Sequence, residues 1–171
     1  MSGYTITGRQ TRALQDAVAD LRVRSESRAV LIIDSEGRVM ACSPDRADMD
    51  PDTVSALAAG TFVAARRLAG MLGETTFRSI SHEGEKMSLY MESAGSGFLV
   101  LVIFGGETIV GLVRLYTAKL IGEIAPALAR VSGQTNPALA GASPFRIDTE
   151  RPVFPVAEHG AMNDKRYVRS G

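Results

Sequence analysis

The longest apolar run of the chain, residues 98–104, places the strongest constraint on the fold. Side chains of a strand point alternately to its two faces, and this run is apolar at both sets of positions. That pattern is typical of a strand that is covered on both sides or that lies centrally in a sheet. The run is far shorter than the roughly 20 residues that cross a bilayer as a helix, so it predicts a strand and no membrane insertion.

Around this strand, apolar periodicity and turn residues predict seven further elements. They are helices over 7–24, 51–72 and 108–131 and strands over 28–33, 39–42, 75–82 and 87–93. Asp50 and Pro51 suit the start of the second helix and Gly73 suits its end, whereas Pro126 should end or kink the third. The order α-β-β-α-β-β-β-α predicts an α/β domain of the α+β type, with one five-stranded antiparallel sheet.

The second helix is crowded with small residues. They are Ala56, Ala58, Ala59, Gly60, Ala64, Ala65 and Ala69. A glycine inside a helix costs about 1 kcal/mol relative to alanine, and small side chains let another backbone approach closely. Close packing against a second chain and close packing on the helix's own sheet both fit this pattern.

The side-chain directions along the helices give specific expectations. We expect Ala65 and Leu68 to face the core, which puts Arg66 and Arg67 on the surface because consecutive helical residues point about 100° apart. In the third helix we expect the buried side to include Leu112 and Leu115. We expect Gly111 there to be a packing position, pressed by a neighbour.

The strand over 75–82 should form an edge of the sheet, because the sheet is built from two blocks of strands separated by a helix. Exposed edges pair readily with another chain, and a symmetric dimer is the economical result. We therefore predict a homodimer. Its predicted interface consists of Ala58, Thr61, Phe77 and Ser79.

From residue 133 the composition changes. Four prolines (Pro137, Pro144, Pro152 and Pro155) interrupt every possible element, and apolar periodicity disappears. The sequence thus predicts a domain over residues 1–132 and a mostly disordered tail over 133–171.

Neither charge nor motifs indicate catalysis or nucleic-acid binding. Lysine plus arginine and aspartate plus glutamate both number 19, whereas nucleic-acid binding usually needs a basic surface. The single cysteine, Cys42, lies among apolar residues and is expected to be a small buried strand residue. The two histidines, His82 and His159, lack neighbours that would make a metal or acid–base site. We expect no catalytic residues, no metal and no cofactor, and a cytoplasmic protein that is not an enzyme.

Several segments resemble one known family. They are His82-Glu83-Gly84-Glu85-Lys86, Ser88-Leu89-Tyr90-Met91, the apolar run 99–104, Gly111-Leu112-Val113-Arg114-Leu115 and the helix over 57–74. Together they resemble the Roadblock/dynein light chain superfamily, with the bacterial MglB group, regulators of gliding motility, as the nearest branch. The tail segment 141–145 is also similar to a short motif of MglB tails.

The resemblance implies a homodimer that binds a Ras-like small GTPase of the MglA type and accelerates GTP hydrolysis, in cell polarity or motility, without an active site of its own. The alternative is a scaffold that binds a GTPase, or another Roadblock protein, without changing the hydrolysis rate. We place the partner-binding residues at Gly60, Val63, Arg66, Arg67 and Gly70. A tail anchor is expected at Ser143, Pro144 and Phe145.

Overall fold

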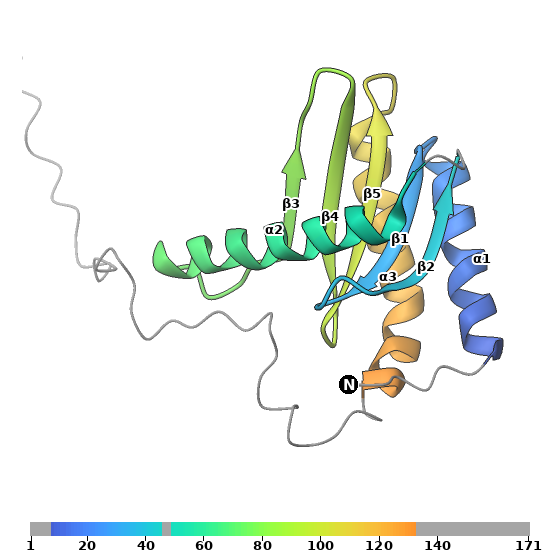
Figure 1. Cartoon of the computed structure of the whole chain (residues 1–171), viewed down its shortest axis with the longest axis horizontal. Helices are drawn as coiled ribbons and strands as arrows, with labels where there is room; N and C mark the ends of the chain where they lie inside the picture. Colours follow the sequence, from blue (N-terminus) through green and yellow to red (C-terminus); the bar gives the residue numbers. More distant parts are fainter. Residues whose placement is uncertain (1–7, 46–48, 133–171) are drawn as a thin grey trace, which may run out of the picture.

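The computed structural model describes residues 8–45 and 49–132 (Figure 1). Its helices are α1 (Gly8–Arg24), α2 (Pro51–Met71) and α3 (Val110–Ser132). Its strands are β1 (Ala29–Asp34), β2 (Val39–Pro44), β3 (Ser79–His82), β4 (Met87–Gly95) and β5 (Phe98–Gly105). The predicted order of elements is confirmed, although β3 starts four residues later than the pattern indicated. The predicted tail, with its anchor residues 143–145, lies outside the described residues.

The five strands form one antiparallel sheet in the order β2-β1-β5-β4-β3. The apolar run is its central strand, as predicted: Leu101 of β5 lies opposite Leu31 of β1 on one side and Met91 of β4 on the other. Strands β2 and β3 form the two edges, so the expectation of an edge at β3 is confirmed as well.

Helices cover both faces of this sheet. Figure 1 shows α2 crossing in front of the strands, with α1 and α3 behind them. The alternation along β5 divides its side chains between two cores: Val100 and Val102 pack in the core beneath α1 and α3, and Leu99 and Leu101 in the core beneath α2. A strand covered in this way needs apolar residues at every position, which explains the continuous run.

The start of α2 is fixed by local chemistry that the sequence predicts correctly. The Asp50 side chain accepts hydrogen bonds from the backbone N–H groups of Asp52 and Thr53 at 3.2 and 3.3 Å, and Pro51 follows as the first helical residue. The hydrogen bonds from Thr53, side chain and backbone, lower the pKa of Asp50. Gly73, with a φ of +90°, follows the helix end.

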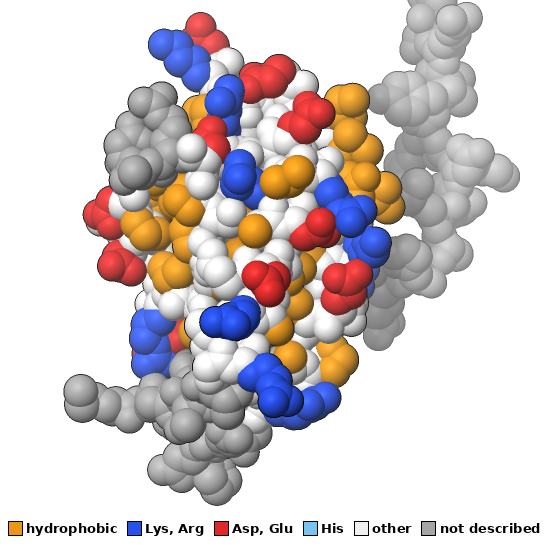
Figure 2. Space-filling view, turned by 90° about the vertical axis from the view of Figure 1, so that its right-hand side faces the viewer, with side chains coloured by type: hydrophobic (Ala, Val, Ile, Leu, Met, Phe, Trp, Pro, Cys, Tyr) orange, Lys and Arg blue, Asp and Glu red, His pale blue; other side chains and the backbone are white. Residues whose placement is uncertain are grey.

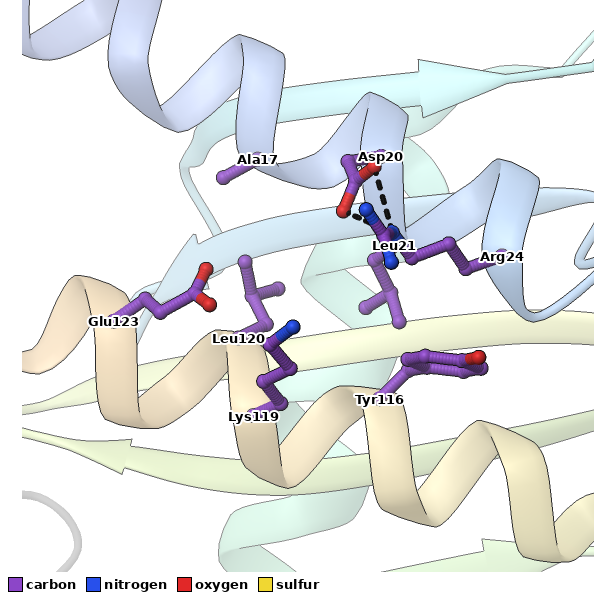
Figure 3. A pocket seen from close by; sticks show the side chains of 8 residues that line it. All are labelled: Ala17, Asp20, Leu21, Arg24, Tyr116, Lys119, Leu120 and Glu123. Carbon is purple, nitrogen blue, oxygen red and sulfur yellow. Dashed lines mark hydrogen bonds and ion pairs between the residues drawn. The ribbon is translucent and has the colours of Figure 1, made fainter.

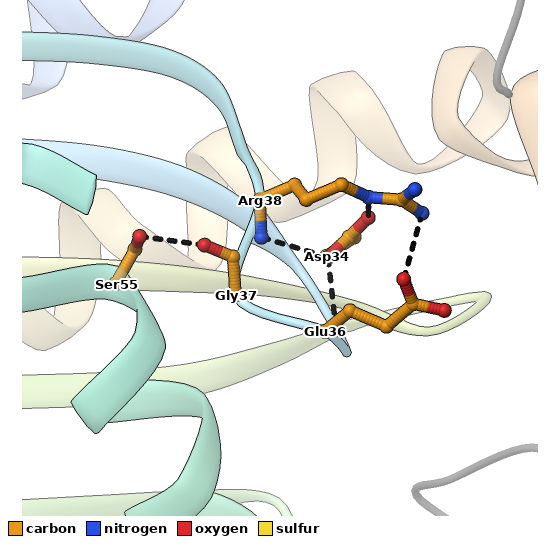
Figure 4. A network of polar contacts seen from close by, with 5 residues as sticks. All are labelled: Asp34, Glu36, Gly37, Arg38 and Ser55. Carbon is orange, nitrogen blue, oxygen red and sulfur yellow. Dashed lines mark hydrogen bonds and ion pairs between the residues drawn. The ribbon is translucent and has the colours of Figure 1, made fainter. Parts of the chain in front are cut away.

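The β1–β2 turn is tied to the first turns of α2 (Figure 4). The fully buried Asp34 carboxylate accepts from the backbone N–H groups of Glu36 and Arg38, both at 2.9 Å, and from Nε of Arg38 at 2.6 Å. The Ser55 hydroxyl then donates to the Gly37 carbonyl at 2.6 Å. These bonds fix the end of the hairpin and hold α2 against it.

Of the two outcomes predicted for Pro126, an end of α3 is wrong, because the helix continues through the proline to Ser132. Proline costs the helix a hydrogen bond. Ile124 before it and Leu128 and Val131 after it are nevertheless buried in the same core. We attribute the continuity to this packing, which offsets the local cost.

The contact between hairpin and helix makes Gly37→Ala destabilising. Gly37 has a φ of +83°, and a Cβ placed there would lie 2.7 Å from Cα of Ala56. We expect the free energy of unfolding to fall by about 1–3 kcal/mol, from backbone strain and overpacking. Gly95→Ala is the matched control, because its φ is +75° and nothing lies within 4 Å of its added Cβ. Denaturant titration would measure both, and equal losses would contradict the close approach of α2.

Candidate protein-docking surface

The leucines and the methionine of α2 point away from the sheet. The residues that face the sheet are Ser55, Ala58, Ala59, Phe62, Arg66 and Gly70. On the outer side, Leu57 and Leu68 are 68% and 58% exposed, and Met71 and Leu72 are also exposed. The expectation that Leu68 faces the core is therefore wrong.

The reason for this orientation is how closely α2 approaches the sheet. Ser55, Ala58 and Ala59 are small, and Phe62 fills the remaining space with its ring centroid 5.1 Å from that of Phe77. Leucines at the small positions would push the helix away. Of the two interpretations of the small residues, packing on the helix's own sheet therefore holds for this face. The outer leucines are exposed to water, although full burial of such a side chain would stabilise the protein by about 1.5–3 kcal/mol.

The outer face of α2 continues toward the free edge of the sheet. In Figure 1 the C-terminal turns of α2, which carry Leu68 and Met71, project past β3. Within the described residues β3 pairs with β4 alone. We call the outer face of α2 together with the β3 edge the α2 surface, and its residues are Leu57, Gly60, Thr61, Arg67, Leu68, Met71, Leu72 and 79–82.

The predicted partner-binding residues divide between the two sides of α2. Gly60 and Arg67 are exposed and Val63 is half-buried, so these three are accessible from outside. Arg66 is only 4% exposed and Gly70 is buried, so both face the sheet. The prediction that both arginines lie on the surface is thus wrong for Arg66, and burial lowers the pKa of its guanidinium.

The predicted dimer residues also divide. Thr61 is exposed on the α2 surface, and Ser79 lies half-buried on the edge strand. Phe77 is half-buried against Phe62, and Ala58 is buried at 7% exposure against the chain's own sheet. Ala58 is therefore a core residue here. The sequence reading missed Leu57, Leu68, Met71 and Leu72, although the spacing of Phe62, Arg66 and Gly70, four residues apart, was a signal for the opposite stripe.

Gly111 of α3 is a further correction. The residue is exposed, and a Cβ placed there would meet nothing within 4 Å. None of the described residues therefore presses on it. Leu112 and Leu115, expected on the buried side, are 37% and 60% exposed.

Charged residues of both signs lie on one side face of the molecule. On the face formed by α1 and the β2 edge, which Figure 2 shows, acidic and basic side chains are interspersed. Among residues 8–45 and 49–132 there is no group of three or more His, Cys, Asp or Glu that could hold a metal ion. Cys42 is half-buried in β2, and burial raises the pKa of its thiol, which disfavours the reactive thiolate.

None of the helices in the described part of the chain is both long enough and apolar enough to span a bilayer.

Several proteins of known structure share the fold of this chain. Myxococcus xanthus MglB is 28% identical, with a TM-score of 0.69 that covers 74% of this chain and 96% of that protein. The gliding protein MglB from Thermus thermophilus is 27% identical with a TM-score of 0.66, covering 78% and 98%. An MglB solved in a tetrameric arrangement is 27% identical with a TM-score of 0.68 and the same coverage.

Comparison of sequences points to the same family. An uncharacterized protein of Methanocaldococcus jannaschii is 33% identical over 94 residues, which are 55% of this chain and 81% of that relative. Residues 14–104, from α1 to the end of the central strand, match the Roadblock/LC7 domain. The chain belongs to the Roadblock/LC7 domain family and is similar to the bacterial MglB proteins within it.

Proposed function

We propose that this protein is a homodimeric regulator that binds a Ras-like small GTPase of the MglA type in the cytoplasm and accelerates its GTP hydrolysis. The observation that carries the proposal is the α2 surface, where four large apolar side chains lie exposed beside β3, a strand that pairs with β4 alone among the described residues. Large apolar residues gathered on one surface mark protein contacts. The resemblance to MglB supports the identity of the partner.

The β3 edge favours a symmetric dimer. Pairing of β3 with β3 of a second copy would extend the sheet across both chains and satisfy the backbone groups of the edge. The end of α2 that projects past β3 would then lie over the same face of the second copy's sheet. Apolar residues on that face, such as Met87 and Leu89, are left partly exposed within one chain. A dimer of this kind is isologous, so each chain covers the other in the same way.

In this proposal, the groups that hydrolyse GTP are those of the partner GTPase. Arg66 is buried and Arg67 is carried by a rigid helix, so neither suits a finger that reaches into a closed nucleotide site. Hydrolysis in Ras-like enzymes needs an ordered water and ordered switch loops. A dimer that binds the catalytic arrangement of these loops more tightly would shift the population toward it. Arg67 would orient the partner by charge.

The alternative function is a scaffold that binds the GTPase, or another Roadblock protein, with no effect on hydrolysis. A GTP hydrolysis assay on a purified MglA-type GTPase separates the two. Under the proposal, hydrolysis rises with added protein and reaches a plateau. Binding without any rise would favour the scaffold, and absence of binding would contradict both.

The dimer makes a prediction about Leu68. In Leu68→Glu, a charge would be buried at the proposed interface, so we expect the fraction of dimer to fall at least tenfold while the thermal unfolding temperature of the chain stays within a few degrees of wild type. Sedimentation equilibrium gives the association constant. Val23→Glu is the matched control, because Val23 is 65% exposed on α1, away from the α2 surface. Equal association of wild type and Leu68→Glu would contradict this interface.

Arg67 is predicted to act on binding and not on the chemical step. Charges at the rim of an interface act mainly on association rate and salt dependence. Arg67→Ala should weaken GTPase binding several-fold and reduce its salt dependence, while hydrolysis at saturating regulator stays close to wild type. Arg12→Ala on the exposed side of α1 is the control. A variant that binds normally but no longer stimulates hydrolysis would show that Arg67 takes part in the chemistry.

A further inference from the structure

The two edges of the sheet differ in how their backbone groups are satisfied. Strand β3 pairs with β4 alone among the described strands, and its four residues include no proline. At the other edge, Gln15 of α1 reaches the backbone of Cys42 in β2. Its Nε2 donates to the Cys42 carbonyl at 2.6 Å, and its Oε1 accepts from the Cys42 N–H at 3.4 Å. One side chain therefore satisfies both backbone polar groups of this edge residue.

Strand β2 has further features that discourage pairing on its outer side. Backbone groups of an antiparallel edge strand point alternately toward the neighbouring strand and outward. Because the backbone of Cys42 bonds Gln15, Cys42 is an outward residue, and Pro44 is outward by the same alternation. Proline has no N–H to donate to an added strand. The register of β1 and β2 also shifts between Ile32 and Ile33. Proline and such irregularities protect sheet edges from pairing with another chain.

The packing of α1 places Gln15 at this edge. The side chains that α1 buries in the core are Leu14, Val18 and Leu21. Arg22 lies seven residues after Gln15, and so on the same side of the helix, and its Nε donates to the Ser43 hydroxyl at 3.1 Å. Between α1 and α3 there is a pocket of about 20 Å³, room for about one water molecule (Figure 3). Helix α1 is therefore held both by α3 and by β2, and this fixes the position of Gln15.

The chemistry of glutamine suits this position. Its side-chain amide carries N–H donors and a carbonyl acceptor, which are the groups that an added strand would present to Cys42. Glutamate has no donor for the Cys42 carbonyl, and asparagine is one methylene shorter. A strand that adds to β2 would have to displace Gln15 before it could bond this residue.

We propose that Gln15 closes the β2 edge to strand addition, so that a second copy pairs through β3. The inference rests on the proposed β3 dimer and names the residue that limits association to it. With both edges open, copies would pair alternately through β3 and β2 and build a sheet without an end. With β2 closed, association stops at two chains.

Sedimentation equilibrium on the full chain tests the inference where the β3 dimer is blocked. At a concentration where the Leu68→Glu chain has the single-chain mass of 18.2 kDa, adding Gln15→Ala should shift the mass toward twice that value. We expect the association constant to rise at least tenfold, and to rise further when Pro44→Ala restores an N–H at the edge. Asp16→Ala is the matched control, because Asp16 is exposed at the next position of α1. It should leave the mass at 18.2 kDa.

A second variant separates an opened edge from a damaged helix. Gln15→Lys keeps a donor for the Cys42 carbonyl and adds a charge, which also protects an edge, so it should leave the Leu68→Glu chain single. Hydrogen exchange at the Cys42 amide locates the contact. In the Leu68→Glu background, this exchange should be faster in the dilute Gln15→Ala chain than with Gln15 present, and slower once that chain associates.

Three results would overturn the inference. They are a Gln15→Ala chain that never associates, equal association of the Gln15→Ala and Gln15→Lys chains, and an association that leaves exchange at the Cys42 amide unchanged. Failure of the proposed dimer has a different signature, because wild type itself would then be a monomer. Gln15→Ala alone should still associate in that case, and the closure of β2 would stand without the β3 dimer.

Discussion

The close packing of α2 against the sheet determines which side chains of this helix remain on the surface. The hydrogen bond from Ser55 to the Gly37 carbonyl, at 2.6 Å, holds the helix against the β1–β2 turn. Gly37 has no Cβ, and the Ala56 backbone occupies the place where one would stand. Ala58 and Ala59 continue the close approach along the helix, and Phe62 ends it against Phe77. Because the small residues take the inner side, the leucines of α2 are left on the outer side.

This arrangement suits the role proposed above, in which the protein acts by docking on a partner. A regulator needs a rigid surface that presents apolar area in a fixed position, and the sheet supplies the rigidity. The central strand β5 is covered on both faces, so its side chains are divided between two cores, one beneath α2 and one beneath α1 and α3. Leu57, Leu68 and Met71 on the outer face of α2 remain exposed in the single chain. This face also lies beside β3, which pairs with β4 alone among the described strands.

Local rules predicted the elements well and the directions of side chains less well. The Asp50 cap, Gly73 and the apolar central strand depend on neighbours in sequence, so their positions could be read directly. Helix α2 carries two stripes, one with Leu57 and Leu68 and one with Phe62, and hydrophobic periodicity alone does not say which faces the chain's own sheet. The prediction that Arg66 lies outside follows from the expectation that Leu68 faces the core. Its position four residues after Phe62 was the better guide.

The account's central claim is that the outer face of α2 is covered by another chain in the working assembly. Hydroxyl-radical footprinting measures the exposure of side chains directly. The comparison is between the Leu68→Glu chain at a concentration where it is a monomer and the wild-type chain in complex with a GTP-loaded MglA-type GTPase. Met71, 43% exposed in the single chain, is a sensitive probe on this face. We predict that its oxidation rate falls several-fold in the complex, while that of Val23 on α1 is unchanged. An oxidation rate of Met71 that stays the same in a complex shown to have formed would contradict the claim.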